Sequence, residues 1–447
     1  MKRLSGTTAA VIPFDSRRNT KVRRFSPYPT RQNPPRMNTI RIAAATAIAL
    51  TVFALPAAAD WPQWRGPHRD GSCSGTKWPK DLSGLKEKWR LPLGASYSGP
   101  VTKGPLVFTT ESRDKQFELA HAVDAESGKI VWTAQWEGYQ GIPFFAARNG
   151  DWIRATPAVD DSSVYVSGMQ DILVSLNAST GKEIWRINFP KEFKAGGQSF
   201  GNVCSPLVDG DALYTHVGAG FCKLDRKTGK LIWRSLDDGG GMTGGSFSSP
   251  VVATLSGKRQ VVVQGRTALS GLDPDNGTAL WSQPVKAFRG MNIFTPVVKG
   301  NRIFTSAYDG ASQAWDVGKA GGTMKPGIAW EHKSEGYMST PVVIAGKIFM
   351  HQRNHRFTCF DFATGTQHWV SDEKFGEYWS MIYQGDRILA LDQNGTLLLI
   401  RANPQKLEIL AQKKLTMEEC WAHLAVDGRT LYVRELRALV AYEWAGE

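Results

Sequence analysis

The sequence has few cysteines and no motif for several common chemistries. Its 447 residues contain five scattered cysteines and no CxxC pair, so we predict neither a zinc site nor a dithiol redox site. Cys204 and Cys222 could form a disulfide within one repeat in an oxidising compartment, and buried free thiols are the alternative that the sequence favours. No phosphate-binding loop, Ser-His-Asp elbow or nucleic-acid-binding stripe is present. We therefore assign no catalytic residue and no metal site, and we expect no nucleic-acid partner.

The net positive charge is small outside the first 59 residues. The chain carries a net charge of +13, but residues 1–59 hold ten Lys or Arg against a single acid, Asp15. The remaining residues contain 44 basic and 40 acidic side chains. The basic character therefore belongs to a leader and says little about partners.

The leader divides into two parts. Residues 1–36 are rich in Arg, Pro, Ser and Thr, and we predict a disordered basic extension. Residues 37–59, "MNTIRIAAATAIALTVFALPAAA", combine a charged start, a short apolar run and an Ala-x-Ala end, which is typical of a secretory signal peptide. Met37 is then a candidate true start, and an uncleaved anchor is the alternative. We predict a secreted or periplasmic protein with no transmembrane span in the mature chain.

A ten-residue pattern that ends in tryptophan recurs along the chain. Its copies are "VDAESGKIVW", "LNASTGKEIW", "LDRKTGKLIW", "LDPDNGTALW" and "FDFATGTQHW". The Asp or Asn can bond a backbone N–H two residues on, and the Gly supplies the positive φ of a tight turn. Each copy therefore predicts a β-hairpin whose second strand carries the Trp.

A second pattern precedes the hairpins and predicts a strand entered through Ser/Thr-Pro. Examples are "ATPAVDDSSVYVSG", "CSPLVDGDALYTHVG" and "STPVVIAGKIFMHQ", and degenerate copies begin at Trp379 and Trp421. Proline is compatible with the first residue of a strand. Together the two patterns make eight units of four strands, with no helical periodicity.

The spacing of the repeated tryptophans indicates a closed ring of blades. They are Trp89, Trp132, Trp185, Trp233, Trp281, Trp330 and Trp369, at intervals of 39 to 53 residues. We predict an all-β fold over residues 85–447, an eight-bladed β-propeller of four-stranded antiparallel blades. The eighth unit has only three strands, so the strand at Leu85–Leu93 should complete it. An open solenoid is the alternative. We expect each Trp to fill the space between neighbouring blades.

The repeated Asp-x-x-Thr-Gly-Lys-x-x-Trp pattern resembles the pyrroloquinoline-quinone (PQQ) type β-propeller repeat. The resemblance covers about residues 85–447 and implies the fold, but the family contains two functional classes. One is the quinoprotein alcohol and sugar dehydrogenases, which hold PQQ and Ca²⁺ at the channel mouth. The other is non-catalytic and includes the propeller lipoprotein that supports assembly of outer-membrane barrels. The chain lacks the adjacent cysteine pair and long loops of the enzymes, and it lacks a lipidated cysteine after the leader.

The loops that lead into the first strands should surround the channel mouth, where ligands usually bind. Several polar residues share similar positions in these loops and are candidates for one ligand site: Asp151, Arg154, Asn202, Asn292, Tyr337, Glu377 and Glu419. They suit a polar or anionic ligand or a metal, and a hydrated rim without a ligand is the alternative.

The segment before the ring, residues 60–84, has two early tryptophans and an arginine among Gly and Pro in "WPQWRGPHRDG". It is too apolar for a free linker, so we expect it to pack on the propeller. Our hypothesis is a secreted or periplasmic, non-catalytic binding or scaffold protein, monomeric, with a protein or small polar ligand at a propeller face. The alternative is a quinoprotein alcohol or sugar dehydrogenase that requires PQQ and Ca²⁺.

Overall fold

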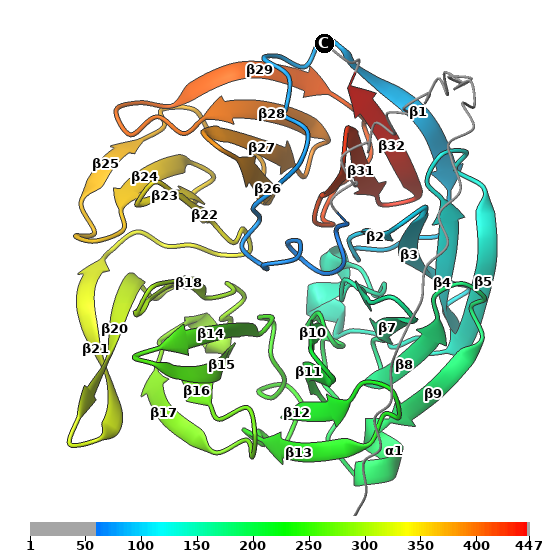
Figure 1. Ribbon diagram of the computed structural model, residues 1–447, viewed down its shortest axis with the longest axis horizontal. Coiled ribbons are helices and arrows are strands. Elements are labelled where there is room, and N and C mark those ends of the chain that lie inside the picture. The colour runs from blue at the N-terminus through cyan, green and yellow to red at the C-terminus, as the bar shows by residue number, and fades with distance from the viewer. Residues whose placement is uncertain (1–59, 445–447) are drawn as a thin grey trace, which may run out of the picture. The chain divides into compact units, whose positions relative to one another are not determined.

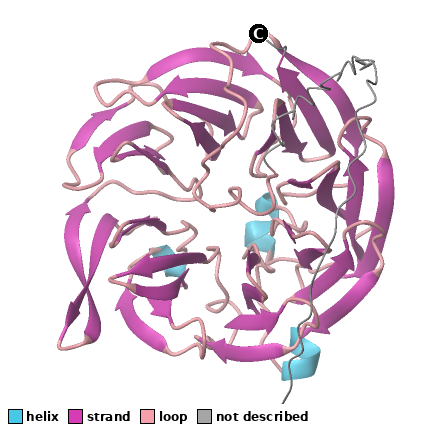
Figure 2. Ribbon diagram, viewed as in Figure 1, coloured by secondary structure: helices cyan, strands magenta, loops and turns pink. Residues whose placement is uncertain are grey.

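The computed structural model describes residues 60–444, and the predicted extension 1–36 and signal peptide 37–59 lie outside them. Eight four-stranded antiparallel sheets are arranged in a ring, which we name blades A to H (Figure 1). This confirms the predicted eight-bladed propeller. Helix is confined to η1 (Phe144–Asn149), α1 (Phe189–Phe193) and η2 (Phe288–Gly290), all in connections between blades (Figure 2).

The blades follow one another in chain order. Blade A contains β2 (Val101–Lys103), β3 (Leu106–Arg113), β4 (Phe117–Asp124) and β5 (Ile130–Glu137). Blade B contains β6 (Ala158–Val159), β7 (Ser163–Ser167), β8 (Ile172–Asn177) and β9 (Glu183–Asn188). Blade C contains β10 (Leu207–Asp209), β11 (Ala212–Val217), β12 (Gly220–Asp225) and β13 (Leu231–Ser235). Blade D contains β14 (Val251–Leu255), β15 (Lys258–Gln264), β16 (Ala268–Leu272) and β17 (Ala279–Pro284).

The second half of the ring has the same order. Blade E contains β18 (Val297–Lys299), β19 (Arg302–Ser306), β20 (Ser312–Ala320) and β21 (Thr323–His332). Blade F contains β22 (Val342–Ile344), β23 (Lys347–His351), β24 (Phe357–Asp361) and β25 (Gln367–Val370). Blade G contains β26 (Trp379–Gln384), β27 (Arg387–Asp392), β28 (Thr396–Arg401) and β29 (Glu408–Lys414). Blade H contains β30 (Ala425–Asp427), β31 (Thr430–Glu435), β32 (Ala438–Trp444) and β1 (Leu85–Pro92).

Burial follows the position of a strand within its blade. The second strands β7 and β11 are buried at every residue, because blades pack on both sides of them. In the outermost strand β5 only Trp132 and Trp136 are buried and the other residues are exposed or half-buried, as expected for a strand largely in water. The hydrophobic core therefore lies between the blades rather than at one centre.

The first and last described strands close the ring. Strand β1 pairs antiparallel with β32, from Leu85 opposite Trp444 to Pro92 opposite Ala438. This confirms that an N-terminal strand completes the last blade. Because the ring is closed, every blade has a neighbouring blade on both sides.

The repeated tryptophans contact the following blade through its hairpin turn. The Nε1–H of Trp185, for example, donates to the carbonyl oxygen of Arg226 at 3.0 Å. A Cβ atom on Gly229, the turn glycine of the same hairpin, would lie 2.8 Å from the Trp185 ring. Trp89, Trp132, Trp233, Trp330 and Trp369 make the equivalent bond. The turn therefore requires glycine for two reasons: its φ is positive, and the indole approaches too closely to leave room for a Cβ.

Trp281 differs from the other six repeated tryptophans. Its Nε1–H donates to Gln260 within its own blade, because the next blade replaces the short turn with the longer hairpin β20–β21. Val317 and Met324 of that hairpin are buried against blade D, so packing of the longer hairpin takes the place of the usual tryptophan contact.

The Ser/Thr residues before the strand-entry prolines bond neighbouring blades to one another. The backbone N–H of Thr156 donates to the Ser205 hydroxyl at 3.0 Å, and that of Ser205 donates to the Ser249 hydroxyl at 3.1 Å. Bonds of the same direction join A to B, D to E and E to F. Between F and G and between G and H the direction is reversed, because the backbone N–H groups of Trp379 and Leu424 donate to the hydroxyls of Ser339 and Ser380. These hydroxyls therefore form a belt around the inner ring, a role that the sequence pattern does not reveal.

Residues 61–73, which we name the plug, pass through the centre of the ring (Figure 1, blue). The Arg65 guanidinium donates to the carbonyls of Thr340 and Pro341 at 2.7 and 2.6 Å. Arg69 donates to the carbonyls of Ser205 and Pro206 in another part of the ring, at 3.1 and 2.9 Å. The plug therefore links blades C and F across the channel.

All five cysteines are free thiols, Cys204 and Cys222 included. Burial raises the pKa of the Cys222 thiol to about 12, so this side chain behaves as a small apolar group. Within residues 60–444, no helix has the length and apolar character needed to cross a membrane.

Candidate functional site at the channel mouth

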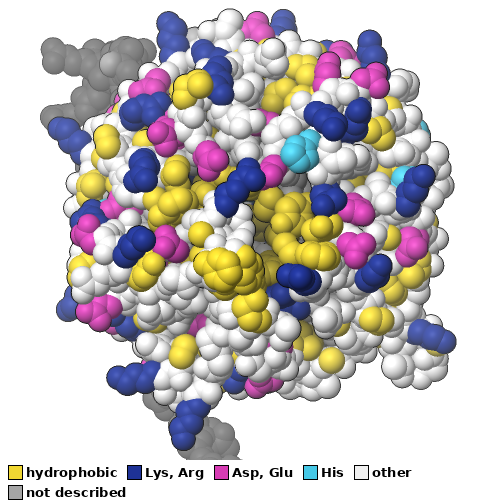
Figure 3. All heavy atoms as spheres, turned by 180° about the vertical axis from the view of Figure 1, so that it is seen from behind, with side chains coloured by type: hydrophobic (Ala, Val, Ile, Leu, Met, Phe, Trp, Pro, Cys, Tyr) yellow, Lys and Arg dark blue, Asp and Glu magenta, His cyan; other side chains and the backbone are white. Residues whose placement is uncertain are grey.

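The two faces of the ring carry different structures. The hairpin face carries the Trp-contacting turns, and the plug enters the channel there. The loop face carries the connections that lead from one blade to the next. Figure 3 shows the face opposite to the view of Figure 1, where hydrophobic side chains gather around a central hollow. This hollow is the mouth of the channel.

Asn202 and Asn292 are fully buried and do not reach the hollow. The Asn202 amide donates to the carboxylate of Asp171 and to the carbonyl of His216, both at 3.0 Å. The Asn292 amide donates to the carbonyls of Arg266 and Val285 at 2.9 and 3.2 Å. Both side chains therefore attach a lead-in loop to nearby backbone or side chains, which orders the loop.

Asp151 and Arg154 lie in the connection between blades A and B. Asp151 accepts from the Tyr139 hydroxyl at 2.8 Å. The half-buried guanidinium of Arg154 donates to the carbonyls of Gly150 and Trp152 at 2.7 and 3.3 Å, and no carboxylate of the described residues forms an ion pair with it. Burial lowers the pKa of Arg154 to about 10, so it stays charged at neutral pH.

Glu377 and Tyr337 lie close to each other at the mouth. Glu377 faces Arg148, with Oε1 3.8 Å from Nη2. The half-buried Tyr337 ring packs edge-on against Tyr308 at 5.6 Å. Burial raises the pKa of Tyr337, and the nearby charge of Glu377 raises it further.

Glu419 is exposed and accepts from the Trp421 indole at 3.1 Å. It lies near Tyr97, whose pKa is raised to about 12 by burial first and by Glu419 second, while Arg154 opposes the shift. The structure thus brings Arg154, Tyr97 and Glu419 together, places Tyr337 beside Glu377, and leaves the two asparagines elsewhere.

Apart from Tyr337, the aromatic side chains at the mouth were not among the residues proposed from the sequence. Each of the eight connections on the loop face contributes at least one aromatic side chain, and the rings pair in three groups. The members are Tyr97, Trp152, Phe200, Phe247, Phe288, Tyr337, Tyr378 and Trp421. The signal in the sequence was at least one aromatic residue per connection, at a variable distance from the strand that follows.

Four large apolar side chains of the loop face are strongly exposed. Phe144 and Phe145 of η1 are 91% and 58% exposed, Met417 is 87% exposed and Met242 is 47% exposed. They lie in three different connections. Large exposed apolar groups gathered on one face mark an interaction site more often than scattered ones.

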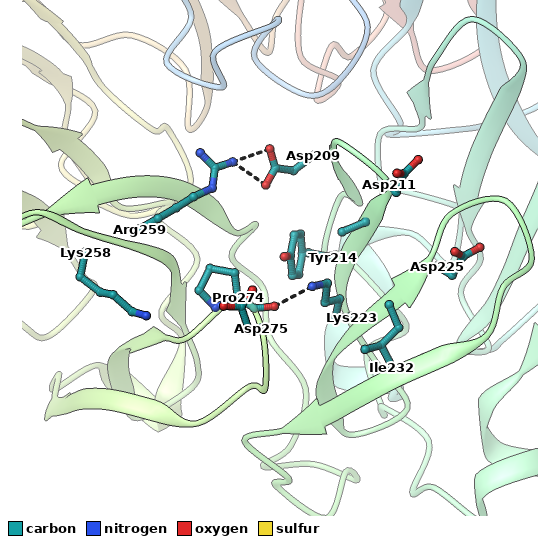
Figure 4. A pocket seen from close by; sticks show the side chains of 11 residues that line it. Asp209, Asp211, Tyr214, Lys223, Asp225, Ile232, Lys258, Arg259, Pro274 and Asp275 are labelled. Atoms are coloured by element: carbon teal, nitrogen blue, oxygen red, sulfur yellow. Dashed lines mark hydrogen bonds and ion pairs between the residues drawn. The ribbon is translucent and has the colours of Figure 1, made fainter. Parts of the chain in front are cut away.

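A separate cavity of about 380 Å³ lies between blades C and D at the hairpin face (Figure 4). Its basic side chains are already engaged. Arg259 contacts both carboxylate oxygens of Asp209 at 2.6 Å, and Lys223 donates to the carbonyl of Pro274 at 2.7 Å. This cavity is therefore a surface groove whose basic side chains already bond to other protein groups, which argues against a preformed ligand site.

The alternative function would need a calcium ion and PQQ. Among residues 60–444, no three His, Cys, Asp or Glu side chains gather in a way that could hold a metal ion. At the mouth, Glu377 faces Arg148 and Glu419 accepts from Trp421, so these carboxylates do not share a ligand position. The residues present do not fit a carboxylate-bound calcium ion.

Comparison with known proteins agrees with this fold. A family profile described as outer membrane protein assembly factor BamB matches residues 115–371, more than half of the chain. The chain belongs to this family. The crystal structure of BamB from Moraxella catarrhalis has a TM-score of 0.58, with 17% sequence identity over 81% of this chain and 98% of that chain. At this identity the likeness shows the fold alone.

Two curated relatives represent the two functional classes. Outer membrane protein assembly factor BamB of Yersinia pestis is 22% identical over 300 residues, covering 64% of this chain and 70% of that protein. Polyvinylalcohol dehydrogenase of Sphingopyxis sp. (strain 113P3) is 26% identical over 170 residues, covering 34% of this chain and only 24% of the enzyme. The enzyme similarity therefore spans a part of the ring and a small part of the enzyme.

Proposed function

We propose that this protein is a secreted or periplasmic, non-catalytic scaffold that binds partner proteins through its loop face. The observation that supports this most directly is the exposure of Phe144, Phe145 and Met417 on the connections of a rigid ring. Aromatic residues and Met are enriched at protein interfaces, because they bury a large apolar area. Membership of the BamB family supports a role in the assembly of outer-membrane proteins.

The ring suits a scaffold because several kinds of contact outside the exposed loop tips hold its blades together. Hydroxyl-to-backbone bonds, docked tryptophans and the plug hold the blades together. The connections on the loop face can therefore carry exposed apolar side chains on a fixed frame.

Site-specific photocrosslinking in cells tests this proposal. A benzophenone amino acid at Phe145 or Met417 is expected to crosslink to partner proteins. The matched control is Ile184 on β9, which is 45% exposed on an outer strand and is expected to give little crosslinking. Equal crosslinking at Ile184, or none at Phe145 and Met417, would contradict a binding role for the loop face.

The enzyme alternative is tested on the same purified protein. Incubation with PQQ and Ca²⁺, followed by dye reduction with alcohols and sugars, is expected to give no turnover and no retained cofactor. Retained PQQ together with turnover would favour a quinoprotein dehydrogenase.

A further inference from the structure

Four aromatic rings line one side of the channel mouth in an unbroken series, which we name the aromatic arc: Trp152, Tyr97, Trp421 and Tyr378. Trp152 meets Tyr97 edge-on at 5.2 Å, Tyr97 lies 5.9 Å from Trp421, and Trp421 stacks on Tyr378 at 5.8 Å with 18° between the planes. The rings come from four different connections. Tyr378 is nearly buried and the other three are half-buried, so the arc keeps part of its aromatic surface open.

A helical turn reaches from blade A toward the opposite side of this mouth. Helix η1 lies near the centre of the ring (Figure 2). Its Arg148 approaches Glu377, which precedes blade G, and its Phe145 packs edge-on against Phe200 at 6.2 Å. Gly150 ends the turn at φ 69°, and a Cβ atom there would overlap the Trp152 ring. An ion pair as exposed as Arg148–Glu377 adds little stability.

Polar groups of both signs border the arc. Arg154 is a donor with no carboxylate partner among the described residues, and it influences the pKa of Tyr97. Glu419 and Glu377 are acceptors in the connections that carry Trp421 and Tyr378. A hydroxyl group can accept from a guanidinium and donate to a carboxylate, and hydrogen bonds to charged groups are the stronger ones. A ligand with many hydroxyls and no net charge can form hydrogen bonds with both the guanidinium and the carboxylates.

We propose that the aromatic arc binds a carbohydrate, an oligosaccharide whose C–H faces pack on Tyr97 and Trp421 while its hydroxyls bond Arg154 and Glu419. Trp and Tyr combine a large apolar face with a polar group, which matches the two kinds of surface on a sugar ring. An apolar peptide would offer Arg154 and Glu419 no hydrogen bond beyond those that they already make within the protein. This inference goes beyond the proposed function, because it concerns a different ligand and different side chains.

Isothermal titration of the purified protein with neutral tetrasaccharides, namely cellotetraose, maltotetraose and chitotetraose, tests the proposal. At least one is expected to bind and to change tryptophan fluorescence. Trp421→Ala is expected to weaken that binding at least about tenfold, the effect of losing one aromatic contact. The control Ile184→Ala changes an exposed residue of the outer strand β9, away from the mouth, and is expected to leave the affinity within about twofold.

Two further variants keep the test decisive if Trp421→Ala unfolds. Trp421→Phe retains a ring and is expected to bind within about threefold of the wild type. Arg154→Gln is expected to weaken sugar binding about tenfold, since it removes a charge-assisted donor. Absence of binding by all three sugars, or equal affinity in the wild type and Arg154→Gln, would overturn the proposal. Tighter binding of a Phe-rich peptide that depends on Trp421 would overturn it as well.

The experiments can refute the sugar-binding proposal and the scaffold proposal independently of each other. Crosslinking at Phe145 is expected to persist in Trp421→Ala, because the Phe145 ring packs on Phe200 and not on a ring of the arc. Loss of sugar binding with crosslinking intact would leave the scaffold standing, and the reverse would leave the sugar site standing.

Discussion

Aromatic side chains have different surroundings on the two faces of the ring. On the hairpin face, the Trp185 indole donates to a backbone carbonyl of the next blade and its ring covers a glycine. On the loop face, Trp421 stacks on another aromatic ring and its N–H bonds an exposed carboxylate. The same residue type thus joins blades at one face and leaves surface available for a ligand at the other.

The difference follows from how each position is specified. The hairpin tryptophans occupy one fixed position in a repeat, so neighbouring blades present the same turn to each of them. The loop aromatics occur in connections of different lengths, so no single geometry applies to all. Repeated positions therefore serve stability, and unrepeated ones remain free for binding.

Loss of an arginine in the plug is expected to have the largest effect on stability. Arg65→Met leaves the buried carbonyls of Thr340 and Pro341 without donors, and should lower the free energy of unfolding by about 3–5 kcal/mol. Urea unfolding followed by circular dichroism measures it. Arg437→Met, at an exposed residue, is the control and should change the free energy by less than about 0.5 kcal/mol.

A methyl group on a turn glycine separates the effect of close packing from that of backbone conformation. Gly229→Ala places a Cβ against Trp185 at φ 74° and should cost about 3 kcal/mol. Gly300→Ala has φ 60° and nothing within 4 Å, so it should cost only about 1 kcal/mol. Equal losses in urea unfolding would show that the tryptophan contact adds nothing.

The buried carboxyl group of Glu118 should make stability depend on pH. Burial raises its pKa to about 7, although the carboxyl accepts from Met169 N–H and from the Trp136 indole. A raised carboxyl pKa stabilises the fold at low pH, and this stability is lost as pH rises through 7. The wild type should lose roughly 2–3 kcal/mol between pH 5 and pH 8 from this group.

Glu118→Gln is expected to remove most of that loss, because the amide cannot ionise. Unfolding free energies at several pH values between 5 and 8 measure both proteins. An unchanged slope in the variant would mean that Glu118 does not carry the pH dependence.

Exchange of a tryptophan for phenylalanine compares the two faces directly. Trp185→Phe leaves the Arg226 carbonyl without its donor and should cost about 1 kcal/mol. Trp421→Phe breaks only an exposed bond to Glu419 and should cost less than about 0.5 kcal/mol. A larger loss for Trp421 in urea unfolding would contradict the division of roles.

The sequence predicted the ring because its features repeat. Asp, Gly and Trp at fixed spacing specify a hairpin locally. The strand that ends at Pro92 has no hairpin of its own, so it could pair only with the incomplete last blade. The different contact of Trp281 could not be predicted from that residue, because it depends on the longer hairpin of the next blade. The inter-blade bonds of Ser205 and Ser249 likewise require knowledge of the neighbour.

The channel mouth was harder to predict for a physical reason. Asn202 and Glu377 occupy similar positions before their strands, yet one is buried and bonded and the other is partly exposed. Sequence gives the chemical type of a loop residue but not the direction in which its side chain points. A polar side chain in a loop often bonds nearby backbone instead of a ligand.

The pairing of β1 with β32 also has a consequence for folding that proceeds from the N-terminal side. Strand β1 is then available before any complete blade, and its partner becomes available after all other strands described here. Until then β1 must wait with an unpaired edge that a strand from another molecule could occupy. Exchange of this strand between two copies is thus the misassembly to which a ring closed in this way is most exposed.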